Sequence, residues 1–216
     1  MVLVLLMGVT ASADQINFDL NVPNTALSVF AGPYAKVTVD RTDSTHAKIT
    51  FDSYTGGAAI YLLGDSGVAA VNVNGTFTLG TISGSNSFAG FTPGTLSDDG
   101  SKNVSAFGTF NQTLKDTDGF GDTYTKIDFN LIASGSTSWA NASNVLVAND
   151  KGPTAAAHIF PWDGARNPTN DKPINTFGTE TGFAGNATPI PEPATMLLLG
   201  SGLIGLAGLA RKKFKK

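Results

Sequence analysis

The sequence of 216 residues contains no cysteine, which excludes disulfide bonds, thiol nucleophiles and thiolate zinc sites. Glutamate is nearly absent as well, because every acidic residue except Glu180 and Glu192 is an aspartate. Aspartate favours turns over helix interiors, and Gly, Ser, Thr and Asn are abundant. The composition therefore predicts an extracellular β-protein with few helices, and the chain is long enough to bury a core without disulfide bonds.

Basic residues are scarce outside the C-terminus. Residues 14–193 carry nine Lys and Arg against 17 Asp and Glu, a net charge of −8, and the other five basic residues lie at 211–216. An acidic body does not attract nucleic acid or anionic lipid through charge. We therefore expect no nucleic-acid partner.

The C-terminus holds a hydrophobic run that the body lacks. Residues 194–210 carry no charge and are just long enough to cross a bilayer as a helix. Before them stands Pro191-Glu192-Pro193, in which the prolines favour an extended, exposed backbone. After them come basic residues that would keep this end in the cytoplasm, namely Arg211, Lys212, Lys213, Lys215 and Lys216.

This arrangement closely resembles the PEP-CTERM family of sorting tails, over residues 190–216. The resemblance implies that an exosortase, a membrane-embedded cysteine protease, recognises the tail and cuts near Pro191-Glu192-Pro193. It also implies a surface or extracellular-matrix protein of bacteria that often make exopolysaccharide. The alternative is an ordinary C-terminal membrane anchor, which needs only hydrophobicity and positive charge.

The N-terminus has features of a secretory signal. Residues 2–9 are apolar, and Ala11-Ser12-Ala13 is a small-x-small cleavage site directly before the polar Asp14, with Ala11 and Ala13 as its small residues. No Lys or Arg precedes the apolar stretch, so we interpret residues 1–13 as a signal-peptide remnant. A buried first strand is the alternative, and it fits the abrupt change to polar residues less well.

Short β-patterned runs separated by turn-forming residues fill residues 16–162. The clearest run is 125–131, in which one side of the expected strand is apolar and the other polar. We expect about ten to twelve strands in an all-β domain at 14–162, an antiparallel and jelly-roll-like β-sandwich. Residues 163–189 predict a loop-rich end and linker, and residues 190–216 a sorting tail with a single transmembrane helix.

Several local features of this domain can also be predicted. Asn74-Gly75 predicts a two-residue hairpin turn, since both positions tolerate positive φ. Residues 98–100, Asp-Asp-Gly, predict a turn that leads into a strand at 103–110, and a short strand is expected around 88–91. The apolar run at 155–160 predicts a central strand that is buried on both faces.

Residues 116–122, Asp-Thr-Asp-Gly-Phe-Gly-Asp, resemble a metal-binding loop. Calcium prefers several carboxylate and carbonyl oxygens around a sharp bend, so Asp116, Asp118 and Asp122 are candidate ligands. The segment lacks the third aspartate at alternating spacing and the distal glutamate of an EF-hand loop. The alternative is a solvated turn before the strand at 125–131, and no other cofactor is expected.

Candidate catalytic and sugar-binding residues have weak sequence support. His46 lies in a polar segment and His158 in an apolar one, and both are expected to have structural roles. No G-x-S-x-G motif is present, so serine-hydrolase chemistry has no specific support. Several aromatic residues could stack on sugar rings, although most are expected in the core: Tyr34, Tyr54, Tyr61, Tyr124, Trp139 and Trp162.

Two functions remain open from the sequence. The first is an exported cell-surface or extracellular-matrix protein, not an enzyme, with a structural or adhesive β-domain. Its expected partners are exosortase, the inner membrane transiently, and exopolysaccharide. The second is a secreted hydrolase or lyase that acts on polysaccharide and carries the same tail. A glycosidase would need paired carboxylates in a cleft.

Overall fold

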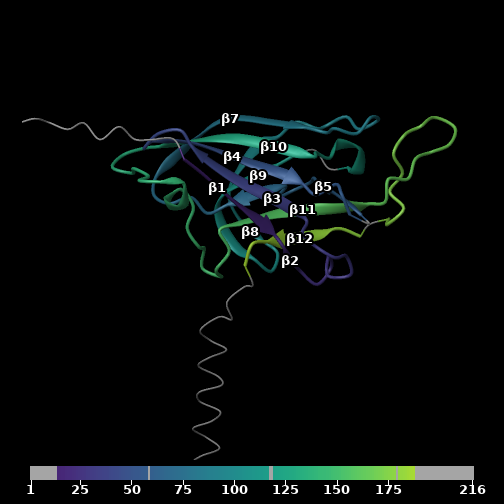
Figure 1. The fold of residues 1–216 in the computed structure, drawn as a ribbon, viewed down its shortest axis with the longest axis horizontal. Coiled ribbons are helices and arrows are strands. Elements are labelled where there is room, and N and C mark those ends of the chain that lie inside the picture. The colour runs from purple at the N-terminus through teal and green to yellow at the C-terminus, as the bar shows by residue number, and fades with distance from the viewer. Residues whose placement is uncertain (1–13, 58, 117–118, 179, 188–216) are drawn as a thin grey trace, which may run out of the picture.

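The computed structural model describes residues 14–57, 59–116, 119–178 and 180–187. Within these ranges the chain forms β-strands and two short 3₁₀ helices, and the strands assemble into two antiparallel sheets (Figure 1). The predicted all-β, antiparallel fold is confirmed. The described residues contain no helix with the length and apolar character needed to span a bilayer. The predicted transmembrane helix at 194–210 and the signal remnant at 1–13 lie outside these residues.

The first sheet has the strand order β1-β3-β4-β10-β7. Its members are β1 (Asp14–Leu20), β3 (Ala35–Arg41), β4 (His46–Ser53), β10 (Lys126–Ala133) and β7 (Phe77–Ser85). In β10, Ile127, Phe129 and Leu131 are buried, whereas Asn130 between them is exposed. One face of this sheet therefore packs on the core while the other meets solvent, as the alternating sequence predicts.

The second sheet has the order β2-β12-β11-β6-β9-β8, and β5 also pairs with β11. Its members are β2 (Val22–Pro23), β12 (Gly182–Gly185), β11 (Ala155–Trp162), β6 (Ala69–Val71), β9 (Gly108–Lys115), β8 (Ser97–Val104) and β5 (Ile60–Leu63). Every residue of β11 is buried, which confirms the predicted central strand. The main hydrophobic core draws on both sheets, so they pack face to face as in a β-sandwich.

At its C-terminal end, around Trp162, the outer face of β11 is covered by aromatic side chains. The rings of Phe88 and Phe91 lie with their centroids 5.3 and 5.1 Å from that of Trp162. The predicted strand at 88–91 is wrong, because this segment has no strand structure. Its apolar residues are explained by their packing on β11, which a strand pattern alone does not reveal.

The expected hairpin at Asn74-Gly75 is wrong. β6 lies in the second sheet and β7 in the first, so this segment crosses between the sheets. Gly75 has a φ of +84°, as a tight turn requires. The Asn74 side chain donates a hydrogen bond to the carbonyl of Asn144 at 2.9 Å, and the Asn74 carbonyl accepts one from the Trp139 indole at 2.9 Å. These bonds tie the crossing to the loop after β10, and such distant partners cannot be inferred from turn residues.

The expected turn at 98–100 is also wrong, since these residues lie inside β8. Gly100 has a φ of +62°, and the register of β8 against β9 shifts on both sides of it. Glycine here serves a β-bulge rather than a turn. The chain reverses instead at 105–107, where Ala106 has a φ of +70°, so the predicted strand at 103–110 is divided between β8 and β9.

The predicted loop-rich end at 163–189 contains a strand that was not expected. β12 pairs with β11 on one side and with β2 on the other. Its four residues are too short to show a β pattern among the surrounding Asn, Thr and Gly. The second sheet therefore extends to Gly185, close to the sorting tail.

A buried arginine links the first strand to a distant loop. Arg41 is 3% exposed, and its Nε donates to Asp14 Oδ1 at 2.6 Å. The other carboxylate oxygen of Asp14 accepts from the main-chain N–H of Ala142 at 2.7 Å. This N–H bond, followed by Arg41, lowers the pKa of Asp14. The carboxylate therefore compensates the arginine charge at neutral pH.

Candidate functional site

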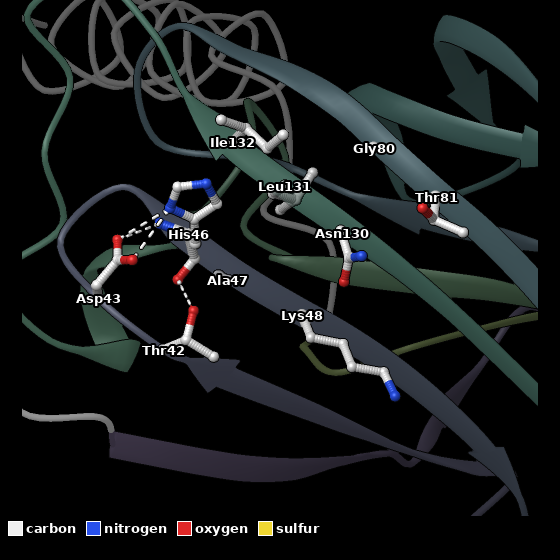
Figure 2. Close-up of a pocket in the computed structure, with 10 residues that line it drawn as sticks. All are labelled: Thr42, Asp43, His46, Ala47, Lys48, Gly80, Thr81, Asn130, Leu131 and Ile132. Atoms are coloured by element: carbon white, nitrogen blue, oxygen red, sulfur yellow. Dashed lines mark hydrogen bonds and ion pairs between the residues drawn. The ribbon is translucent and has the colours of Figure 1, made fainter.

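A groove of about 520 Å³ lies on the outer face of the first sheet, across β4, β10 and β7. Figure 2 shows the side chains of Lys48, Asn130 and Thr81 projecting from these three neighbouring strands. His46 stands at one end of the groove, where β4 begins. The lining of the groove mixes polar side chains with apolar ones, among them Ile132, which is 37% exposed.

An irregularity in strand pairing forms this groove. Phe129 pairs with Ile82 and Leu131 pairs with Leu79, so Asn130 faces two residues of β7, Gly80 and Thr81. Two residues opposite one is a β-bulge, which locally bends the strand. Gly80 has no side chain, and a Cβ there would lie 3.1 Å from the Asn130 Cβ. The depression therefore depends on both the bulge and this glycine.

The turn before β4 orients His46. Asp43 Oδ1 accepts hydrogen bonds from the main-chain N–H groups of Thr45 at 2.7 Å and His46 at 2.9 Å. Both carboxylate oxygens also lie 3.1 Å from His46 Nδ1. The Thr45 N–H is the main cause of a lowered pKa for Asp43, with the Thr45 hydroxyl and His46 adding to it. Figure 2 shows the second ring nitrogen, Nε2, pointing away from Asp43.

The other polar side chains of the groove differ in whether they already form hydrogen bonds or ion pairs within the protein. Lys48 Nζ lies 3.1 Å from Asp128 Oδ1, which also accepts from the Thr50 hydroxyl at 2.6 Å. Among the residues that the structure describes, the Asn130 amide and the Thr81 hydroxyl make no hydrogen bond, and both residues are exposed. Such neutral donors and acceptors suit the hydroxyl groups of a sugar. The sequence did not single out these residues, because the bulge that exposes them depends on strand pairing.

The predicted calcium loop is only partly described. Asp116 and Asp122 are near enough to each other to interact electrostatically, and Asp118 lies outside the described residues. Both carboxylate oxygens of Asp116 are buried and lack a partner with good hydrogen-bond geometry within the described ranges. Burial is the main cause that raises the pKa of Asp116 to about 7; the charges of Asp65 and Asp122 add to it, although the nearby main-chain N–H of Asp65 partly lowers the pKa. In these ranges no three acidic or histidine side chains converge in a way that could hold a metal ion.

Asp116 is predicted to destabilise the fold at high pH. Its folded pKa lies above the unfolded value of about 3.9, so stability falls as the pH rises from about 4 to 7. A pKa shift of this size corresponds to a loss of at most about 4 kcal/mol in the free energy of unfolding. Solvent screening of this half-buried group reduces the loss to about 1–2 kcal/mol. We expect Asp116→Asn to raise the unfolding free energy by that amount at pH 8 in chelator, and to have little effect at pH 4.

Calcium can be tested in the same denaturation experiment. If calcium binds Asp116, adding millimolar calcium raises the wild-type melting temperature and leaves Asp116→Asn unchanged. Asp171→Asn is a suitable control, because the Asp171 side chain is 81% exposed and lies in a different loop. Equal calcium-induced shifts of the melting temperature in the wild type, Asp116→Asn and Asp171→Asn would exclude Asp116 as a ligand.

His158 lies in β11, in the other sheet from His46, so the two histidines do not form a pair. Its ring stacks on Phe183 of β12 with the centroids 4.4 Å apart, and its Nε2 lies 3.1 Å from the Thr181 hydroxyl. Its Nδ1 lies 3.6 Å from Asp65 Oδ2. A cleft of about 300 Å³ beside this ring is lined by residues that include Asp65, Asp99 and His158.

The aromatic residues considered for sugar stacking are largely unavailable. Five of them are buried: Tyr34, Tyr61, Tyr124, Trp139 and Trp162. Tyr54 is partly exposed, and its hydroxyl donates to Asp19 at 2.8 Å. Tyr54 also borders an apolar groove of about 690 Å³ with Phe30 and Phe177. The prediction that most of these residues are core or rim residues agrees with this burial.

The tail of the chain matches a known sorting signal. Residues 189–212 match the family model of the PEP-CTERM protein-sorting motif. No characterised protein and no solved structure is significantly similar to the chain. The motif implies an exported protein that is sorted by exosortase, a membrane protein, to the cell surface or beyond. Its Pro191-Glu192-Pro193 and basic residues, and the predicted signal site at Ala11 and Ala13, lie outside the described residues.

Proposed function

We propose that this protein is a cell-surface or extracellular-matrix protein whose β-sandwich is a structural or adhesive module without catalytic activity. The observation that carries the proposal is the sorting motif at 189–212, which begins shortly after the last described strand, β12. The chain would enter the export pathway through its N-terminal signal and reside briefly in the inner membrane through its tail. Exosortase would then remove the tail and leave the folded domain outside.

The mass of the protein recovered from the cell surface or medium tests this proposal. Removal of both signals leaves a chain that runs from Asp14 to near Pro193, and a C-terminal peptide identifies the cut. A recovered chain that still ends at Lys216, and occurs only in membranes, would instead indicate a permanent anchor.

We infer that exopolysaccharide is the ligand of the domain and that it binds in the groove across β4, β10 and β7. The unengaged Asn130 amide and Thr81 hydroxyl, together with His46 Nε2, offer hydrogen-bonding groups along three adjacent strands. Lys48 adds a cation at the same surface, which suits a polysaccharide with some acidic sugars. The groove is open to solvent, as suits a chain that extends beyond the binding site.

Alanine substitutions in the groove are predicted to weaken this binding without unfolding the protein. The double variant Thr81→Ala/Asn130→Ala removes two exposed hydrogen-bonding side chains, and each bond contributes about 1 kcal/mol. We therefore expect an affinity loss of about tenfold or more for exopolysaccharide purified from the producing cells. Asn17→Ala, an exposed residue of β1 in the same sheet, is the matched control. Affinity electrophoresis measures the effect, and equal mobility of both variants would place binding elsewhere.

The alternative of a polysaccharide hydrolase or lyase is favoured by one feature, the cleft that contains Asp65, Asp99 and His158. Such an enzyme would release reducing ends or unsaturated sugars from the same exopolysaccharide. We expect no such products from the purified domain. Product formation that His158→Asn abolishes would establish the enzymatic alternative.

A further inference from the structure

The last strand of the described residues, β12, is held on both sides. β12 pairs with β11 through Ala156 and Gly185, and its Phe183 carbonyl accepts from the Asn24 N–H at 2.8 Å. A Cβ at Gly185 would lie 2.7 Å from the ring of Phe107, so this strand packs directly on the turn between β8 and β9. The end of β12 is therefore part of the folded body.

Asn186 follows β12 and fastens the chain to the start of β11. Its Oδ1 accepts from the main-chain N–H of Thr154 at 3.0 Å and of Ala155 at 3.2 Å. Its Nδ2 donates to the Thr154 hydroxyl at 2.8 Å, and its own N–H donates to the Ala155 carbonyl at 3.4 Å. Four hydrogen bonds from one residue fix the point at which the chain leaves the sandwich.

The turn beside this exit point is ordered as well. The Asn149 side chain donates to the Phe107 carbonyl at 2.8 Å and accepts from the Lys151 N–H at 2.9 Å. This turn, at 149–153, leads directly into Thr154. The exit point thus lies beside a hydrogen-bonded turn at the end of the sandwich where β11 begins.

Very little chain separates this exit point from the sorting motif. The matched motif begins at Pro189, three positions after Asn186, and Pro191 is two positions further on. A fully extended chain spans at most about 3.6 Å per residue, so Pro191 lies within about 18 Å of Asn186 and Ala194 within about 29 Å. A folded domain is itself wider than this distance, so it cannot stay far from whatever binds the motif.

We propose that Asn186 is the fixed end of the folded body and a positioning residue for tail removal. The short chain beyond it holds the turn at 149–153 and the end of β12 against exosortase and the adjoining membrane surface during cleavage. This inference rests on the proposed processing of the tail by exosortase. It assigns one end of the sandwich to that contact.

The length of the spacer provides the test. Deletion of Ala187 and Thr188 keeps the matched motif intact but draws the rigid end of the body two residues closer to it. We expect tail removal in the producing cells, followed by pulse-chase and C-terminal mass analysis, to slow by about tenfold or more, since small misplacements at a reacting bond are costly. A ten-residue Gly-Ser insertion between Ala187 and Thr188 should be processed at the wild-type rate.

Asn186→Ala in the deletion background separates a positioning role from a general defect. Loss of its side-chain hydrogen bonds lets the end of β12 fray, so we expect this variant to recover much of the lost rate. Asn170→Ala, in an exposed loop, should not restore it. Processing of the deletion at the wild-type rate, or no recovery with Asn186→Ala in a protein of unchanged melting temperature, would overturn the inference. Failure to process the wild-type tail would instead overturn the proposed function.

Discussion

Replacing Pro191, Glu192 and Pro193 with alanine leaves nearly all of the protein in the inner membrane with its tail attached. The prolines lack amide donors and disfavour helix in the preceding residue, so the sequence favours an extended backbone before the apolar run. Three alanines favour helix and would extend the apolar run toward the body. A protease that needs an extended segment then loses its recognition site, while the predicted anchor at 194–210 is unchanged. Cell fractionation with mass analysis of the C-terminal peptide measures the result.

Pro168→Ala is the control for this experiment, because it removes a proline from an exposed loop of the body and leaves the tail intact. It should be released like the wild type. Unchanged release of the triple-alanine variant would show that the motif at 189–212 does not direct processing. Release of the triple variant with its tail intact would indicate that the run at 194–210 does not anchor the chain.

Trp139→Ala is predicted to be the most destabilising single substitution considered. The Trp139 side chain is fully buried in the main core, and its indole N–H donates to the Asn74 carbonyl at 2.9 Å. Its main-chain N–H also donates to the Ser44 carbonyl at 2.8 Å. Removing a large buried aromatic ring leaves a cavity and costs about 3–5 kcal/mol. The variant also leaves the Asn74 carbonyl without its donor, where the chain crosses between the sheets.

Chemical denaturation of the purified domain measures this effect. Trp139→Phe keeps most of the ring volume and loses only the indole hydrogen bond, so we expect a smaller loss of about 1–2 kcal/mol. A loss below about 1 kcal/mol in Trp139→Ala would mean that the loop containing Trp139 contributes little to the core.

Much of the fold follows from local sequence patterns. The alternation at 125–131 predicted β10, and the apolar run at 155–160 predicted the buried strand β11. Both patterns indicate which side chains of a strand are buried, and this information is contained in consecutive residues. The turn residues at Asn74-Gly75 and at 98–100 led to wrong predictions of a hairpin and a turn. Residues with positive φ occur in hairpins, in crossings between sheets and in bulges alike.

The candidate sites were harder to predict than the strands. The sequence singled out Asp116 and Asp122, and the structure brings their charges together. Asp65, which interacts with Asp116, comes from a turn 51 positions earlier in the chain, so no local motif includes it. The groove needs the pairing of β10 with β7 to place Asn130 opposite Gly80 and Thr81. No spacing within either strand indicates that pairing.

The sequence by itself determined that the protein is exported and sorted, since the sorting motif is a linear segment with proline, apolar and basic parts in a fixed order. It also determined the all-β class, because hydrophobic alternation is a property of consecutive residues. Only the tertiary structure decided which strands are neighbours, where the groove opens and that Asn186 is fastened to β11. These features depend on contacts between residues far apart in the chain, where packing of the two sheets outweighs local preference.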